Sequence, residues 1–324
     1  MTTSSPARKE RQGLVMLILL VQPLLMVSAG VQFDSSGTPV VSPHAQAGDS
    51  AAGRVLGCSG DSTGINTTRL AIVGGTLAAG ITTVHIYQAN GWWKDNKSAF
   101  HFQEDLRYGL HVDKLGHFYA ATGLVFIFKK SLEWANLPEE SALLWGAGAS
   151  ALFQTYVEIE DGFHTWGFDR VDFASDVAGA AYPVAQHYWP YLQNFNIKFS
   201  YHASPLLNKK GLDVGFKGQK HIILDDYEGQ TVWLSLRMKK LLPEPVSSVW
   251  PAWLCLALGY GARDVGTEAG AYRVYFLALD YDLTKIIPQD TSFLRTLSEA
   301  LNFIHLPAPA VRYLPGSVWY GLYF

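Results

Sequence analysis

The chain has 324 residues, of which 48% are hydrophobic and only 16% are charged. This length allows two domains with cores of their own, and the low charge content favours association with a membrane. A formal net charge of −3, with no run of lysine or arginine, excludes a nucleic-acid partner.

Residues 1–29 are predicted to be an export signal. Basic residues within the first eleven precede an apolar stretch over 14–27, and Val27-Ser28-Ala29 has the small residues of a cleavage site. An uncleaved anchor is the alternative, but a stretch this short that contains Pro23 is a poor membrane span. Cleavage would start the mature chain near Gly30.

The two cysteines, Cys58 and Cys255, are too few for a disulfide framework. The sequence Val55-Leu56-Gly57-Cys58 resembles a lipoprotein-processing box, which has to follow an apolar stretch, whereas residues 41–54 are mostly polar and small. Lipid at Cys58 is therefore expected only if export uses a different signal. Residues 30–68 are rich in small and polar side chains, and we expect a disordered tether there.

A bundle of four apolar helices is predicted over residues 69–195. The helices are expected over 70–87, 112–134, 139–159 and 171–192. Gly74, Gly75 and Gly80 would allow neighbouring helices to approach the first one closely. Tryptophan, phenylalanine and tyrosine recur among charges over 92–110, which is typical of a loop at a boundary between water and lipid.

From residue 196 to 324 the apolar period shortens toward two, which predicts antiparallel strands. Two strong strands are expected over 254–260 and 275–283, as a hairpin whose turn lies near 266–270. The weaker elements are strands over 198–202, 221–224 and 231–238, a short helix over 293–304 ending before Pro307-Ala308-Pro309, and a final strand over 318–324. The predicted fold class is therefore α+β, an apolar four-helix bundle followed by a C-terminal antiparallel β-rich region. Five to seven strands are too few for a complete single-chain barrel in a membrane, and the alternation in the last strand fits a lipid-facing strand and an ordinary half-buried one equally well.

Three short clusters of polar residues lie beside or inside apolar helices, where an unpaired charge is costly to bury. Residues three or four apart share a helix face, so each cluster forms one polar stripe. The stripes consist of Asp113 with His117; Gln154, Glu158 and Asp161; and Asp172, Asp176 and Gly179.

If the three stripes meet, the crowded carboxylates cannot all stay ionised without a cation. Oxygen ligands with one imidazole suit Mg²⁺, Mn²⁺ or Ca²⁺, so a divalent cation is the expected cofactor. The predicted metal ligands are His117, Glu158, Asp161, Asp172 and Asp176, and the predicted catalytic residues are Asp113, His117, Glu158 and Asp172. All six should lie within one pocket.

Other interpretations of the same residues stay open. A metal-free site could use a protonated carboxyl as acid and His117 as base, with Lys114 or Arg170 offsetting charge or holding an anionic substrate. Asp113 and Asp172 stand in the first turns of their predicted helices, where capping and the helix dipole favour acids without any catalytic role.

The order Asp-Lys-x-x-His, then Glu with Asp-Gly-Phe, then Asp-x-x-x-Asp-Val-Ala-Gly-Ala resembles the YfiM-like family of predicted periplasmic lipoproteins, over roughly 92–189. The layout is also similar to that of VanZ-like membrane proteins, but Asp176 stands where those have asparagine. The resemblance implies a location in the cell envelope and no known reaction. The β-rich half lies outside the shorter family members.

Two functions follow as expectations. The first is an exported, membrane-associated envelope protein whose polar site acts as a metal-assisted hydrolase or transferase on lipid or cell-wall material. The second is a non-enzymatic structural or assembly protein of the outer membrane, whose polar cluster fixes helix register. Membrane lipid is the expected partner, with an envelope protein as a further candidate partner through the β-rich region.

Overall fold

The computed structural model describes residues 64–91, 93–94, 97–106, 108–207, 223–265 and 270–324, together with a short strand pair at 32–33 and 39–40. The predicted export signal, the lipoprotein-like box at Cys58 and most of the predicted tether lie outside these residues. The helices are α2 Thr67–Ala89, α3 Val112–Trp134, α4 Glu139–Gly162, α5 Arg170–Tyr188, α6 Met238–Leu241, α7 Val246–Val249 and α8 Ser292–Leu301. The strands are β1 Gln32–Phe33, β2 Pro39–Val40, β3 Phe195–Tyr201, β4 Gln230–Leu236, β5 Leu254–Arg263, β6 Tyr272–Tyr281, β7 Ala308–Leu314 and β8 Val318–Tyr323.

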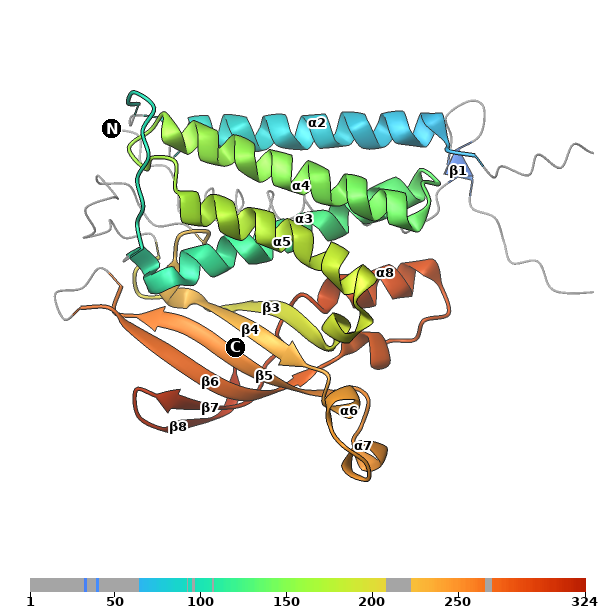
Figure 1. Cartoon of the computed structure of the whole chain (residues 1–324), viewed down its shortest axis with the longest axis vertical. Helices are drawn as coiled ribbons and strands as arrows, with labels where there is room; N and C mark the ends of the chain where they lie inside the picture. The colour runs from blue at the N-terminus through green and yellow to red at the C-terminus, as the bar shows by residue number, and fades with distance from the viewer. Residues whose placement is uncertain are drawn as a thin grey trace, which may run out of the picture.

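The α+β class is confirmed, with a helical layer lying above a six-stranded antiparallel sheet (Figure 1). The strands follow chain order from β3 to β8, so every connection joins neighbours. The change from helix to strand falls at Phe195, one residue before the predicted boundary. The long helices begin within three residues of their predicted starts, because their apolar stripes are continuous.

Helices α3, α4 and α5 pack against one another, and their contact is built from small side chains. Ala121, Val125, Leu143 and Ala180 form the buried centre of this packing. A Cβ on Gly179 would lie 2.3 Å from the backbone oxygen of Phe118, so only glycine allows α5 to approach α3 this closely. The stripe predicted for Asp172, Asp176 and Gly179 therefore lies where α5 contacts α3.

Helix α2 lies alongside this packed group and buries little of its surface, with Val73 and Gln88 as its buried residues. The predicted close contacts at Gly74, Gly75 and Gly80 are wrong within the described part of the chain, where a Cβ at each would meet nothing within 4 Å. Small residues allow close packing but do not by themselves supply a neighbour.

Two predicted elements differ from the structure, and one strand was not predicted. Helix α5 ends at Tyr188 instead of residue 192, because Trp189 precedes Pro190 and a residue before proline avoids helical geometry. Residues 223 and 224 of a predicted strand lie in a turn. Strand β7 was not predicted, because Pro309 suggested a stop. In the structure Pro309 lies at an irregularity in the pairing of β7 with β8, where a missing N–H is tolerated.

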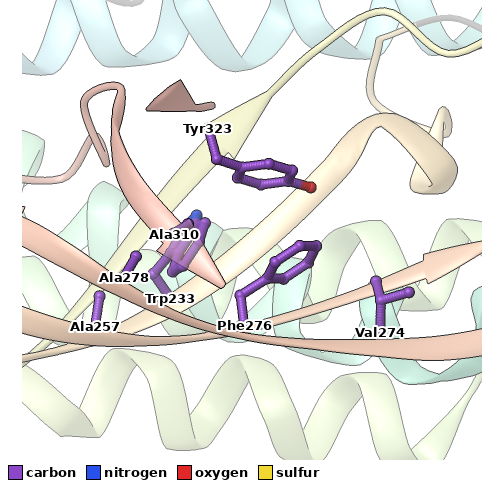
Figure 2. Close-up of a cluster of buried hydrophobic side chains, with 7 residues drawn as sticks. All are labelled: Trp233, Ala257, Val274, Phe276, Ala278, Ala310 and Tyr323. Carbon is purple, nitrogen blue, oxygen red and sulfur yellow. The ribbon is translucent and has the colours of Figure 1, made fainter. Parts of the chain in front are cut away.

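The sheet curls so strongly that its last strand reaches its second. Figure 2 shows the ring of Tyr323 above the strand that carries Phe276, and the two ring centroids are 4.4 Å apart. Tyr323 also packs on Trp233 of β4 at 5.9 Å. A Cβ on Gly259 would lie 2.6 Å from the Trp233 indole, so glycine makes room for this ring inside the curl. The β3 edge is covered in part by Phe303 and His305, which exchange backbone hydrogen bonds with Phe199.

The sheet and the helices meet at the beginning of α3. Val112 is fully buried among Ala262 and Val265 at the end of β5. Farther along α3, Tyr119 stacks on Phe199 of β3 with centroids 5.2 Å apart. The end of the sheet therefore supports the turn that enters α3.

Candidate functional site

The three polar stripes meet where α3 begins, α4 ends and α5 begins. We call the six predicted residues the acidic cluster: Asp113, His117, Glu158, Asp161, Asp172 and Asp176. Four of its carboxylates are buried, Asp161 is partly buried, and the side chain of His117 keeps 23% of its surface exposed. Because α4 runs opposite to α3 and α5, only this end of the bundle can bring the three stripes together.

The entry into α3 is strained. Gly109, Leu110 and His111 all have left-handed φ angles of 55°, 50° and 76°. Such backbone costs about 1–3 kcal/mol at each non-glycine residue and persists where neighbouring groups hold it. The Tyr260 hydroxyl from β5 donates to the Leu110 carbonyl, and the Tyr227 ring lies over Gly109. The sheet thereby sets the direction in which α3 starts.

His117 lies at the centre of the acidic cluster. Its Nδ1 is 3.1 Å and 3.2 Å from the two Asp176 carboxylate oxygens and 3.8 Å from a Glu158 oxygen. Its Nε2 is 3.8 Å from Asp113 and 3.9 Å from Asp172. One imidazole therefore faces four carboxylates drawn from three helices.

Lys114 neutralises a second group of carboxylates beside the first. Its ammonium donates to Asp169 and Asp172 at 2.8 Å each, to Asp113 at 3.2 Å, and at close range to Asp105. Of the two cations predicted to offset charge, Lys114 contacts these carboxylates, whereas Arg170 is exposed and pairs with Glu104 at 2.5 Å. Asp113 and Asp172 belong to both groups.

The balance of charge within the site raises several pKa values. Burial, with nearby Asp172 adding to it, raises the pKa of Glu158 to about 9 against the opposing effect of His117. Burial and the neighbouring Asp113 raise the pKa of Asp172 to about 8. Burial opposes charge on His117 as well, but its hydrogen bond to Asp176 and the adjacent acids raise the His117 pKa well above its usual value. These raised pKa values favour the protonated forms of Glu158 and Asp172, which lowers the negative charge of the site.

Asp161 lies at the edge of the acidic cluster. It accepts a hydrogen bond of 2.6 Å from the indole nitrogen of Trp93, and burial raises its pKa to about 7. The three groups of residues close enough to share an ion contain the other five members but not Asp161. Asp161 therefore lies outside these groups, and its carboxylate is hydrogen-bonded to Trp93. The predicted placement of Trp93 at a lipid boundary is wrong, since its side chain is buried between α2 and α4.

The structure adds four residues to the predicted site. Asp105 and Asp169 bind Lys114, Gln154 donates to Asp176 at 2.6 Å, and Tyr227 donates to Asp113 at 2.6 Å. Gln154 belongs to the stripe predicted for it, together with Glu158. Asp169 could have been found as the N-cap of α5, because it precedes a helix that begins with Arg170. No local pattern points to Asp105 or to Tyr227.

Side-chain capping of helix ends does not explain the two acids for which the sequence suggested it, Asp113 and Asp172. Asp169, not Asp172, caps α5 by accepting from the backbone nitrogens of Val171 and Asp172. Residue His111 precedes α3 and forms no side-chain cap, while Asp113 is engaged by Lys114 and Tyr227. Both predicted capping acids keep their favourable place in a first helical turn, yet their side chains point into the site.

Two overlapping sets of side chains have the spacing of metal ligands, and both contain His117. In one, Asp113, His117 and Asp172 each offer an atom within 4.8 Å of the others; in the other, His117, Glu158 and Asp176 do so. A third set, Asp105 with Asp169 and Asp172, already holds the Lys114 ammonium. The Oδ1 atom of Asp172 is buried and accepts no hydrogen bond from any residue that the structure describes. Such an atom is suited to a cation.

Comparison with known proteins identifies one family. Residues 100–187, about a quarter of the chain, match the family model described as "Predicted periplasmic lipoprotein (DUF2279)". The match takes in the loop before α3, both whole helices α3 and α4, and nearly all of α5, so it contains every member of the acidic cluster. No curated protein and no solved structure matches the chain. The match supports a family of predicted periplasmic lipoproteins, and the narrower YfiM-like and VanZ-like resemblances stay predictions.

Proposed function

We propose that this chain is an exported, envelope-associated protein that binds a divalent cation in the acidic cluster and uses it for hydrolysis or group transfer on lipid or cell-wall material. The family description supports the location. The observation that carries the proposal is the charge around His117, which has four carboxylates within 4 Å and one buried oxygen, Asp172 Oδ1, without a described hydrogen-bond partner.

Mg²⁺, Mn²⁺ or Ca²⁺ fits the site better than a softer metal, because the available ligands are carboxylate oxygens with a single imidazole. Asp113, Asp172 and His117 form the first choice of ligand set, with Glu158 and Asp176 on the opposite side of the imidazole. A cation there would act as a Lewis acid toward a phosphoryl or carbonyl oxygen. Lys114 would stay in place to balance Asp105 and Asp169.

The substrate would approach beside His117, which lies at the centre of the site and keeps 23% of its side-chain surface exposed. A cavity of about 200 Å³ lies elsewhere, between α3, α5, β3 and α8, and no member of the acidic cluster lines it. Glu158, held protonated by its raised pKa in the absence of a cation, is placed to exchange a proton with a group bound at His117.

Metal analysis of the detergent-extracted full chain tests the proposal. We expect one Mg²⁺ or Mn²⁺ per chain after dialysis against either ion, and its loss in a double variant carrying His117→Ala and Asp172→Asn. Asp290→Asn is the control, because Asp290 is an exposed acid outside the acidic cluster. Absence of a bound ion in the unaltered protein, with folding intact, would contradict cation binding.

The reaction requires a separate assay. The loaded protein, incubated with an envelope lipid extract and with isolated cell wall, should release phosphate or change the mass of a component. The metal-free double variant should do neither. If the unaltered chain holds an ion but changes no component, the cation is structural.

A second candidate function is a non-enzymatic envelope protein in which the acidic cluster fixes helix register. The observation that favours it is Lys114, which already satisfies one of the three ligand sets as an internal ion-pair network. This function predicts that His117→Ala and Asp172→Asn reduce the amount of folded protein with no ion involved. Thermal unfolding with and without Mn²⁺ separates the two, since only a cation site gives a metal-dependent rise in Tm.

We infer that α2 and not a lipid at Cys58 attaches the chain to the membrane. Among the described helices, α2 is the one long and apolar enough to span a bilayer by length and composition, and nearly all of its surface faces outward. Cys255 is buried in the sheet, and burial raises the pKa of its thiol to about 11, so any lipid would have to be on Cys58. Metabolic labelling with an alkyne fatty acid should leave the chain unlabelled. Label that disappears in Cys58→Ser would overturn this inference and support lipidation.

A further inference from the structure

The two faces of the curled sheet carry different side chains. Positions that face into the curl combine a buried aromatic core, which includes Trp233 and Phe276, with small and polar residues. On β5 they are Cys255, Ala257 and Gly259, and from β3, β4 and β6 come Lys198, Ser235 and Asp280. These last three form a buried network in which Lys198 and Ser235 lie 2.8 Å and 2.5 Å from Asp280. The alternate positions on β5 and β6, which point away from the curl, are mostly leucines that are partly or largely exposed.

The outward positions form a continuous apolar surface, which we call the outer sheet face: Leu254, Leu256, Leu258, Leu277, Leu279 and Val311. Paired residues on neighbouring antiparallel strands share a face. Leu258 pairs with Leu277, Leu277 pairs with Val311, and Val311 pairs with Trp319 of β8. Leu258 and Leu277 are 43% and 45% exposed, and Trp319 is 67% exposed.

Aromatic side chains border the outer sheet face at both ends of the strands. Trp253 and Tyr281 stack at one end with ring centroids 6.2 Å apart, while Tyr275 and Tyr313 lie together at the other end at 6.1 Å. Tyr275 and Tyr281 are six positions apart on β6, a span of about 20 Å at the usual rise per strand residue. Aromatic side chains favour the boundary between water and lipid, so both ends of this apolar area are suited to a headgroup layer.

Charges lie beyond the aromatic rows, not between them. Arg273 is exposed on β6 past Tyr275, and Lys240 and Lys285 are exposed near the opposite end. Helices α6 and α7 project from that same end of the sheet (Figure 1), and Val249 at the end of α7 is 81% exposed. Lysine beside exposed apolar side chains complements the negative charge of lipid headgroups.

We propose that the outer sheet face is a membrane-docking surface whose occupant is a phospholipid bilayer. The apolar band faces the acyl chains, and the aromatic rows and the lysines lie among the headgroups. The β8 edge has no described strand beyond it, and unpaired backbone groups are not tolerated within hydrocarbon. The outer sheet face therefore lies in the interfacial layer of the membrane and does not cross the bilayer. This surface is independent of the acidic cluster.

Spin labels on the full chain, reconstituted in phosphatidylethanolamine and phosphatidylglycerol vesicles, test the proposal. The background variant is Cys58→Ser; Cys255 is kept, because its buried thiol will not react at neutral pH. The test position is Leu277→Cys. Arg273→Cys is the matched control, since it lies exposed on the same strand beyond the aromatic row.

The label at residue 277 should collide often with oxygen, which concentrates in lipid, and rarely with a water-soluble nickel chelate. The label at residue 273 should show the opposite preference. Equal access of the nickel chelate to both labels would place the outer sheet face in water and overturn the proposal, even if α2 anchors the chain. Spin–spin broadening at residue 277 that vanishes on dilution with unlabelled protein would show that a second copy of the chain covers the outer sheet face. That result would overturn the proposal of a lipid occupant. Neither outcome bears on metal binding at His117.

Discussion

His117 and Lys114 are the two cationic side chains around which the carboxylates of the site are arranged. Lys114 contacts four acids and His117 contacts four, with Asp113 and Asp172 counted in both sets. Two positive charges cannot balance six carboxylates, so protons or a metal ion must complete the balance. Burial raises the pKa of Glu158 to about 9 and that of Asp172 to about 8, which favours the protonated form of both carboxyls.

The first prediction concerns Glu158→Gln in the metal-free protein. A carboxyl whose pKa is raised by folding contributes stability that is complete below its unfolded pKa and is lost as pH rises through its folded pKa. The unaltered protein should therefore lose stability between about pH 5 and pH 9, in part through Glu158. Glutamine removes that titration, so Tm should fall less steeply with pH in the variant. An equal slope in both proteins would show that Glu158 is not buried in its neutral form.

The same carboxyls predict how cation binding depends on pH. A divalent ion replaces the protons on Glu158 and Asp172, so binding releases protons. Apparent affinity for Mn²⁺ should rise between about pH 7 and pH 9, and the rise should be smaller in Glu158→Gln. Isothermal titration in two buffers of different ionisation enthalpy measures the protons released. Affinity that does not change with pH would contradict displacement of these protons.

The third prediction concerns Lys114→Met. Removing one partner of a buried ion pair leaves uncompensated charge, and such losses cost about 3–5 kcal/mol. The yield of folded protein should fall sharply. Lys129→Met is the matched control, because Lys129 pairs with the largely exposed Glu139 and such a surface pair is worth about 1 kcal/mol or less. Similar losses in both variants, measured by thermal unfolding in detergent, would argue against a special role for Lys114.

At the scale of the elements, the acidic cluster depends on how closely α3 and α5 approach. Gly179 allows that approach, and the Thr122 hydroxyl donates to its carbonyl at 2.9 Å. The same contact brings His117 to Asp176. The helix interface and the site geometry are therefore set by one position.

The fourth prediction compares two glycine substitutions. Gly179→Ala places a methyl 2.3 Å from the Phe118 backbone oxygen, so α3 and α5 must separate and Mn²⁺ affinity should fall along with stability. Gly148→Ala on α4 meets nothing within 4 Å and should stabilise by about 0.5–1 kcal/mol, as alanine does in a helix. Thermal unfolding and Mn²⁺ titration of both variants check this. Unchanged affinity in Gly179→Ala would show that the site tolerates a wider helix separation.

At the scale of the whole molecule, the β-rich region contributes directly to the site. Tyr227, which precedes β4, donates to Asp113, and Tyr260 of β5 holds the strained turn at Leu110. The family match covers the helices but not these two tyrosines. The helical bundle alone therefore lacks part of the support that its polar residues have in the full chain.

The fifth prediction uses this link between the two parts of the chain. Tyr227→Phe removes a hydrogen bond to an ionised group, worth about 1.5–3 kcal/mol, and should weaken Mn²⁺ binding by roughly ten-fold or more. Tyr119→Phe is the control, because its hydroxyl bonds to the Phe303 carbonyl between α3 and the sheet without touching the acidic cluster. If both variants bind Mn²⁺ alike, Tyr227 does not position Asp113 for the ion.

Most of the helices and strands, and the polar residues of each stripe, could be predicted from the amino-acid sequence. Apolar periodicity placed α3 from Val112 to Trp134, as the structure has it, and alternation placed β5 and β6. Spacing of three or four residues put Asp113 with His117, and Asp172 with Asp176, because a helix turn is a local property.

The side chains that complete the site come together through contacts between distant parts of the chain. Asp105 and Tyr227 lie 9 and 114 residues from the groups that they contact, and no local pattern encodes such a contact. The same holds for Asp161, which shares a stripe with Glu158 yet turns to Trp93, and for α2, whose glycines found no neighbour. Periodicity identifies the face of an element that is buried or polar, whereas the packing of distant segments determines what that face meets.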